Sequence, residues 1–136
     1  MAQNIYGRRQ ETASYLEGAK RMLEVAELTQ QGGYFVSTVN RAYYAFFYAA
    51  NAALSSQGMA HREHDGAFHG FEEYFVRRGL IEESFGERYG RVLDARKVAD
   101  FEIHAVTTPE RARETIEYAR RFVIRVETML HDEGWL

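Results

Sequence analysis

The sequence predicts an all-α protein, an antiparallel up-and-down bundle of four long helices and one shorter helix. Its 136 residues contain only one proline, and the glycines at 32, 33, 58 and 79 stand at junctions between long apolar-periodic stretches. Apolar residues recur at spacings of three and four over long stretches, which is the pattern of amphipathic helices. No segment longer than a few residues alternates with the period of two that is typical of strands. At this length we expect a single domain, residues 1–136, around one core.

The first two predicted helices meet at a glycine pair. The first covers about 8–31 and ends at Gly32 and Gly33, because glycine accepts the left-handed conformation that closes many helices. The second covers about 34–57 and ends at Gly58. Its middle is apolar on nearly every side, so it is expected to be the most buried element. The inward positions predicted for the two helices are Tyr15, Ala19, Met22 and Ala26, then Val39, Tyr43, Phe46, Phe47, Ala50 and Leu54.

The third predicted helix is the short one. It follows the loop "MAHREHD", covers about 65–78 and ends at Gly79. The fourth covers about 81–106. Its predicted apolar positions are Phe85, Tyr89, Val92, Leu93 and Ile103.

The fifth predicted helix has the clearest start signal. Pro109 fits a first helical turn, where its missing N–H costs no hydrogen bond. Thr107 or Thr108 can cap this turn, and Thr107 with Glu110 fits a capping box. The inward positions predicted for this helix are Ile116, Ala119, Phe122, Val123, Val126 and Leu130.

Composition excludes several classes of function. The chain has 20 acidic and 17 basic residues, so any contact with nucleic acid is expected to be local rather than through a broad basic surface. The absence of cysteine excludes thiolate nucleophiles and thiolate zinc sites, and it fits the reducing cytoplasm. The longest apolar run, "AYYAFFYAANAAL", is shorter than the roughly 18–20 residues that span a bilayer. We therefore expect a cytoplasmic protein with no cofactor, no metal and no membrane contact.

The stretch "DARKVADFEIHAV" places three polar side chains four residues apart: Arg96, Asp100 and His104. Arg96 and Asp100 lie about one helical turn apart and can pair, whereas His104 lies about 12 Å from Arg96 along the axis. Three interpretations stay open. The stretch forms a structural Arg96–Asp100 pair, or Arg96 binds a nucleotide or RNA phosphate, or Arg96 and His104 cleave RNA. Metal-free RNA cleavage needs both a base and a cation at the phosphate, so the third interpretation requires a break in the helix or a second protomer.

Histidines and tyrosines form a second set of candidates. His64 and His69 are five residues apart, which does not align them on one helix face for metal binding. We expect His64 or Asp65 to cap the third helix, and the other histidines of this loop to be solvated. The three tyrosines of "AYYAFFY" are expected to pack in the core, with stacking of bases as the alternative. The arginines of the last helix, interleaved with acidic residues, are expected to form a solvated face.

The order of these motifs resembles that of the HEPN superfamily, in the prokaryotic branch associated with minimal nucleotidyltransferases. The matching features are a tyrosine pair with a nearby phenylalanine, a loop histidine, the end of the third helix, and an Arg-x-x-Ala-Asp-aromatic element. They correspond to Tyr43, Tyr44 and Phe47; His64; Phe75, Val76 and Gly79; and Arg96, Ala99, Asp100 and Phe101. The resemblance covers about residues 10–130. Phe101 stands where that branch usually has tyrosine.

The resemblance implies a homodimer, a nucleotidyltransferase partner, and a role in a toxin–antitoxin or nucleotide-handling pair that binds a nucleotide or RNA. Many members are metal-independent endoribonucleases whose Arg and His are separated by four to six residues, whereas seven residues separate Arg96 from His104. We therefore expect a binding cleft formed by Arg96, Asp100, Tyr44 and His64. The alternatives are a ribonuclease toxin that uses Arg96 and His104, and a structural dimerisation module without its own activity.

Overall fold

The computed structural model of the chain describes residues 4–101 and 106–136, and all of their side chains except those of residues 99–101. Within these residues the fold is all-α and contains no strand, which confirms the predicted fold class. The elements are α1 (Ile5–Gln31), α2 (Phe35–Ser56), α3 (His64–Phe71), the π-helical turn η1 (Glu72–Val76), α4 (Glu83–Phe101) and α5 (Pro109–Asp132).

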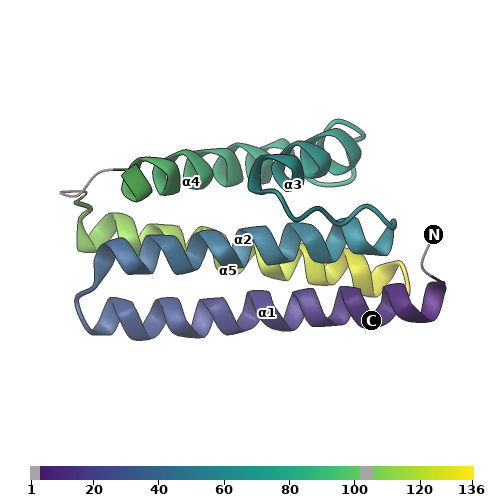
Figure 1. The fold of residues 1–136 in the computed structure, drawn as a ribbon, viewed down its shortest axis with the longest axis horizontal. Helices are drawn as coiled ribbons and strands as arrows, with labels where there is room; N and C mark the ends of the chain where they lie inside the picture. The colour runs from purple at the N-terminus through teal and green to yellow at the C-terminus, as the bar shows by residue number, and fades with distance from the viewer. Residues whose placement is uncertain (1–3, 102–105) are drawn as a thin grey trace.

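The helices α1, α2 and α5 pack along one another, and α3 and α4 lie on the other side of α2 and α5 from α1 (Figure 1). As predicted, α2 is deeply buried: between Ala42 and Ser56 every residue except Tyr44 and Tyr48 is buried. Aromatic rings join the layers at the centre. The Phe46 ring of α2 lies 4.8 Å from that of Phe122 on α5. Rings from α3 and α4 then pack on Phe122, so a single core holds all the helices.

The helix ends follow local signals, with some corrections. Gly33 and Gly58 adopt positive φ angles after α1 and α2, as glycine at these junctions predicts. At the start of α5 the Thr108 hydroxyl accepts a 3.1 Å hydrogen bond from the Arg111 amide. Thr108 is therefore the cap, and the alternative capping box between Thr107 and Glu110 was wrong.

The third and fourth helices also differ from the prediction. The segment predicted as one helix at 65–78 is α3 followed by η1, in which the Arg77 amide donates to the Glu72 carbonyl. The fourth helix begins at Glu83 rather than at 81, and Val106 is not helical. Close approach fixes α4 against α3: a Cβ added at Gly90 would lie 3.1 Å from the Phe68 ring. Glycine at this position therefore lets the two helices pack tightly.

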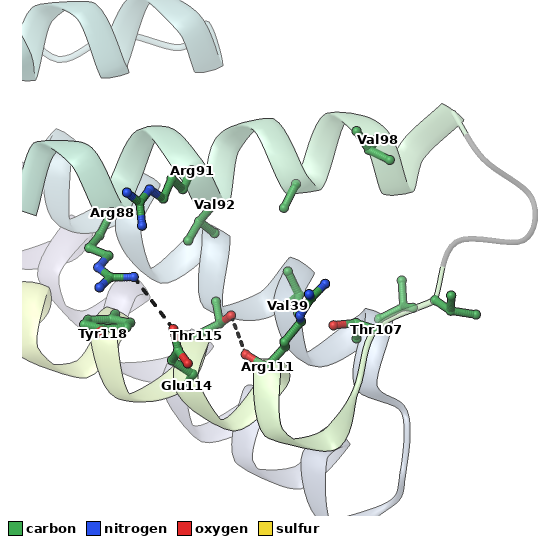
Figure 2. A pocket seen from close by; sticks show the side chains of 13 residues that line it. Val39, Arg88, Arg91, Val92, Val98, Thr107, Arg111, Glu114, Thr115 and Tyr118 are labelled. Atoms are coloured by element: carbon green, nitrogen blue, oxygen red, sulfur yellow. Dashed lines mark hydrogen bonds and ion pairs between the residues drawn. The ribbon is translucent and has the colours of Figure 1, made fainter.

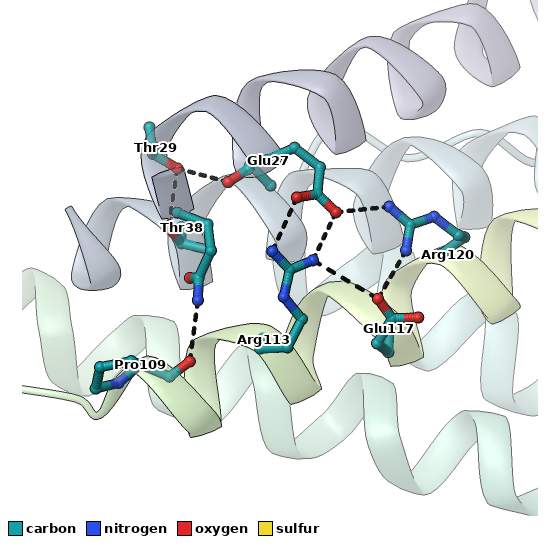
Figure 3. Close-up of polar contacts among 9 residues, drawn as sticks. Glu27, Thr29, Thr38, Pro109, Arg113, Glu117 and Arg120 are labelled. Atoms are coloured by element: carbon teal, nitrogen blue, oxygen red, sulfur yellow. Dashed lines mark hydrogen bonds and ion pairs between the residues drawn. The ribbon is translucent and has the colours of Figure 1, made fainter. Parts of the chain in front are cut away.

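Outside the core, ion pairs join α1 to α5 (Figure 3). The Glu27 carboxylate accepts hydrogen bonds of 2.7 and 3.0 Å from Arg113 and one of 2.8 Å from Arg120. Arg120 also donates to Glu117, one turn before it on α5. Arg113 and Arg120 thus form a cross-helix network on a face that remains accessible to solvent, with side chains 43% and 37% exposed, as the sequence predicted. None of the helices in the described ranges combines the length and hydropathy that crossing a bilayer requires.

Candidate functional site

An aromatic cluster on α2 supports a guanidinium from α4. Tyr43 and Tyr44 are consecutive on α2, and their rings meet edge to face at 5.3 Å. The Arg96 guanidinium carbon lies 5.1 Å from the Tyr43 ring centre and 5.7 Å from that of Tyr44. Both distances are within the range of a cation–π interaction, so the two rings fix the position of the charge. We call Tyr43, Tyr44, Phe47, His64 and Arg96 the Arg96 cluster.

His64, the first residue of α3, belongs to the same cluster. Its Nδ1 atom lies 2.6 Å from the hydroxyl oxygen of Tyr43. Its ring lies 4.5 Å from Phe47 and 5.7 Å from Tyr44. When the Tyr43 hydroxyl donates to Nδ1, the neutral imidazole carries its proton on Nε2. His64 is therefore anchored on α2, and the expectation that His64 or Asp65 caps α3 was wrong, since the cap position is Glu63 and has no side-chain hydrogen bond.

A buried asparagine places the loop that carries His64. The Asn51 side-chain nitrogen donates to the His61 carbonyl at 3.0 Å, and its oxygen accepts from the His61 amide at 2.8 Å. Asn51 is 1% exposed, so this pair of hydrogen bonds replaces water for both groups. The His61 ring then lies over the start of α3, where a Cβ at Gly66 would be 2.2 Å from it. Sequence reasoning did not assign a role to Asn51, although a polar residue in the most apolar helix was the available signal.

An ion pair joins α3 to α4 near the Arg96 cluster. The Lys97 ammonium lies 2.7 Å from the Asp65 carboxylate. The hydrogen bond from Lys97 is the main reason why the pKa of Asp65 is lowered from its ordinary value. Both side chains are largely exposed, so the pair positions the two helices more than it stabilises them. Lys97 thus pairs with Asp65, whereas Arg96, its neighbour on α4, lies against the rings of Tyr43 and Tyr44.

The structure brings together three of the residues predicted for the cleft, Arg96, Tyr44 and His64. The side chain of Asp100 and all of His104 lie outside the described residues, so the Arg96–Asp100 pair and the role of His104 stay predictions. His61 and His69 are exposed, as expected for solvated histidines. Within residues 4–101 and 106–136 no group of three histidine, aspartate or glutamate side chains is arranged to hold a metal ion.

The tyrosines divide between core and surface. Tyr43 is fully buried, as core packing predicts, whereas Tyr44 and Tyr48 are partly exposed and their rings lie 5.9 Å apart. Tyr44 thus presents an accessible ring beside a fixed guanidinium and an imidazole. Chemically this arrangement can bind a phosphate through Arg96 and stack a base on Tyr44.

Comparison with known proteins places most of the chain in one family. A family model described as the HEPN domain matches residues 12–129. The chain is 30% identical over 114 residues to a "UPF0332 protein" of Thermotoga maritima, covering 84% of this chain and 86% of that protein. It is 32% identical over 124 residues to a protein of Methanocaldococcus jannaschii named "putative toxin", covering 91% and 92% of the two chains. A second protein of that organism with the same description is 24% identical over 110 residues, covering 81% and 72%.

Proposed function

The chain belongs to the HEPN domain family, and on that basis we propose that it binds the phosphate of an RNA or a nucleotide at the Arg96 cluster, as the helical component of a toxin–antitoxin pair. Two relatives that it resembles over most of their length carry the word toxin in their names, which supports this role. The motifs shared with the branch associated with nucleotidyltransferases support a nucleotidyltransferase as the other member of the pair. A homodimer is part of the same proposal.

The Arg96 guanidinium on the faces of Tyr43 and Tyr44 is the observation that carries this function. A guanidinium held in one place loses little conformational entropy when a phosphate binds, and its planar N–H groups match the phosphate oxygens. The partly exposed ring of Tyr44 lies beside it, where a base can stack. The net charge of −3 makes binding through diffuse attraction weak, so affinity depends on this local arrangement.

Binding of a labelled single-stranded RNA, measured by fluorescence anisotropy, tests the proposal. Arg96→Ala is expected to weaken binding about tenfold or more, because a charge-assisted contact is lost. Arg96→Lys should restore part of the affinity, since it keeps the charge and loses the planar guanidinium. Arg77→Ala is the matched control, because Arg77 is an exposed arginine that pairs with Glu73 one turn away on the same segment. Equal affinities of the Arg96 and Arg77 variants would reject the site.

A ribonuclease toxin is the second candidate, and one observation favours it in a new form. A cation and an imidazole, Arg96 and His64, lie against the same pair of tyrosine rings in one protomer. RNA cleavage without metal requires a base for the 2′-hydroxyl and a cation at the phosphate. We infer that His64 can supply the base from within one chain in the tautomer whose Nδ1–H donates to the Tyr43 hydroxyl, because Nε2 is then unprotonated. In the sequence-based alternative the base was His104.

Growth arrest on expression distinguishes a ribonuclease that uses His64, a ribonuclease that uses His104, and a protein that only binds RNA. A ribonuclease that uses His64 predicts growth arrest by the wild type, and loss of arrest in Arg96→Ala and His64→Ala but not in His104→Ala. If His104→Ala no longer arrests growth and His64→Ala still does, His104 rather than His64 is the base. Absence of arrest and of RNA cleavage by the purified wild type would leave binding as the function. Sedimentation of the purified chain, alone and with a co-expressed nucleotidyltransferase, tests the dimer and the partner.

A further inference from the structure

A pocket of about 790 Å³ opens between α4, the first turns of α5 and the N-terminal half of α2 (Figure 2). Pockets that bind small molecules in proteins commonly measure about 300–1,000 Å³, so this one has the size of a ligand site. Its lining combines a wall of aliphatic side chains with a group of arginines. We call it the α4–α5 pocket.

The apolar wall of the α4–α5 pocket is aliphatic rather than aromatic. Its valines come from α2 and α4: Val36, Val39, Val92 and Val98. Tyr118 of α5 is the single aromatic residue among the described residues that line the pocket. The Arg88 guanidinium carbon lies 3.8 Å from the centre of this ring, and Figure 2 shows the guanidinium between the ring and α4. A cation thus already covers the ring, so the wall suits an alkyl chain, which gains from burial alone, better than a base, which stacks on an aromatic face.

The charges around the α4–α5 pocket are unbalanced. Arg88 lies 3.7 Å from Glu114, the carboxylate of the lining, so these two charges largely offset each other. Arg91 of α4 and Arg111 of the first turn of α5 also line the pocket. Neither of them forms an ion pair with a side chain in residues 4–98 and 106–136. The lining therefore carries a formal excess of positive charge.

An aliphatic wall beside guanidinium groups suits an amphipathic organic acid. A guanidinium binds a carboxylate through two parallel N–H···O hydrogen bonds. Arg91 and Val98 both line the pocket and lie seven residues apart on α4, or about 10 Å along its axis. An alkyl chain of medium length can therefore extend along the valines from a carboxylate bound at Arg91. We propose that the α4–α5 pocket binds an aliphatic monocarboxylic acid of medium chain length, such as octanoic or decanoic acid.

This pocket is separate from the Arg96 cluster. Ala95 lines the pocket, and Arg96 follows it on α4 at about 100° around the helix, on the side of Tyr43 and Tyr44. The two sites therefore use different sides of one helix. The inference goes beyond the proposed function and does not depend on it, because no residue of the Arg96 cluster lines the pocket.

A small organic acid fits the pocket better than a second copy of the chain does. A protein surface that covered the valines would also remove Arg91 and Arg111 from water, and burying unpaired charges is costly. A monocarboxylic acid brings its own negative charge to the arginines and leaves them partly hydrated. Its alkyl chain covers only the valines. Charge complementarity and the aliphatic wall together thus select the ligand class.

Isothermal titration calorimetry with the full chain tests the inference, using octanoate, decanoate and octanol as probes. Octanoate is expected to bind at one site per chain. Decanoate should bind about tenfold more tightly, because two more methylene groups leave water. Octanol should bind about tenfold or more weakly than octanoate, because the contact of the carboxylate with the arginines is lost. Adenosine monophosphate should not displace decanoate.

Variants test both sides of the pocket. The double variant Arg91→Ala and Arg111→Ala should weaken decanoate binding about tenfold or more. Val98→Asp places a carboxylate on the apolar wall and should weaken it as much. Ile124→Asp is the matched control, because Ile124 is 54% exposed against 55% for Val98 and does not line the pocket. Arg96→Ala should bind decanoate as the wild type does, which separates this inference from the RNA site.

Several outcomes would overturn the inference. They are absence of decanoate binding by the wild type, equal affinities of octanoate and octanol or of octanoate and decanoate, displacement of decanoate by adenosine monophosphate, retained binding in the double variant, and equal losses in Val98→Asp and Ile124→Asp. If the wild type binds no decanoate and Val98→Asp changes its sedimentation, the pocket is an interface instead. The substituted side chains of the pocket are exposed, so these variants should keep the thermal unfolding transition of the wild type, which circular dichroism can verify.

Discussion

The first half of α4 packs into the core, whereas the described side chains of its second half do not. Tyr89, Val92 and Leu93 are buried, and the Tyr89 ring contacts both Phe46 and Phe122. From Asp94 to Val98 no side chain is buried. Arg96, the cation of the Arg96 cluster, lies in this second half. Burial thus decreases along α4 toward Arg96, which reaches back to the buried ring of Tyr43 on α2.

The arginines show a similar contrast between two regions. On the α1 side of α5, Arg113 and Arg120 share the carboxylates of Glu27 and Glu117. On the α4 side, Arg111 has no such partner among the described residues. Both groups look alike in the sequence, where acidic residues interleave with them. The number of charges along α5 therefore does not show which arginines pair, because pairing depends on which side of the helix faces the carboxylate of Glu27 on α1.

The largest effect is expected in the core that the first half of α4 shares. Phe122→Ala removes the ring that contacts Phe46, Phe71 and Tyr89. We expect the free energy of unfolding to fall by about 3–5 kcal/mol, because burial is lost and a cavity remains. Urea unfolding followed by circular dichroism measures it. A loss below about 1.5 kcal/mol would show that the core repacks easily.

Asn51→Ala tests whether the loop that places His64 depends on α2. The variant leaves the amide and carbonyl of His61 without their hydrogen-bond partner, so we expect a loss of about 1–3 kcal/mol. The nuclear magnetic resonance signals of the His64 ring should also shift, because His64 follows this loop. Ser37→Ala, at an exposed position of the same helix, is the control. An unchanged His64 spectrum would show that Tyr43 alone places the imidazole.

Tyr89→Phe is expected to stabilise the protein. The Tyr89 side chain is fully buried, and its hydroxyl has no hydrogen-bond partner among the described residues. Burial raises the pKa of this hydroxyl well above its ordinary value, so the group stays protonated. Removing it should raise the free energy of unfolding by about 1 kcal/mol, seen as a higher melting temperature. Tyr34→Phe, at an exposed tyrosine, should change nothing. A lower melting temperature of Tyr89→Phe would reveal a partner for the hydroxyl.

Glu27→Gln probes the ion-pair network and predicts a pH dependence. The hydrogen bonds from Arg113 and then Arg120 lower the pKa of Glu27, so the folded state binds its proton less tightly than the unfolded state does. The stabilisation is therefore complete above the ordinary glutamate pKa of about 4.3, and it is lost as pH falls through the lowered folded pKa. We expect the variant to lose about 0.5–1 kcal/mol at neutral pH.

The measurement is urea unfolding of the wild type and Glu27→Gln at neutral pH and at successively lower pH. The difference between them should shrink in the acid range. Glu17→Gln, an exposed position of α1, is the matched control and should show no such difference. A difference that stays constant into the acid range would mean that the charge of Glu27 is not what stabilises the network.

Much of this organisation could be predicted from the sequence, and its physical reasons are local. Helix period and glycine positions predict α1 and α2, and Pro109 with a capping threonine predicts the start of α5, because these signals act within one turn. Motif resemblance anticipated that Arg96, Tyr44 and His64 lie together. The contact of His64 with Tyr43 was missed, since a residue at the start of a helix is usually expected to cap it. The ion pairs of Glu27 with Arg113 and Arg120 were missed because they join two helices, and spacing along one segment cannot show that these residues meet.

The smallest expected effect concerns the exposed end of α4. Val98→Ala removes two methyl groups from a side chain that is 55% exposed. If the second half of α4 adds little to stability, the free energy of unfolding should change by less than about 0.5 kcal/mol. Ala119→Gly, on the buried side of α5, is the contrasting variant and should cost about 1 kcal/mol or more. Val98→Ala could instead lower the free energy of unfolding as much as Ala119→Gly does. That result would mean that another surface covers Val98 in solution. The contrast between the two halves of α4 would then hold for the isolated chain only.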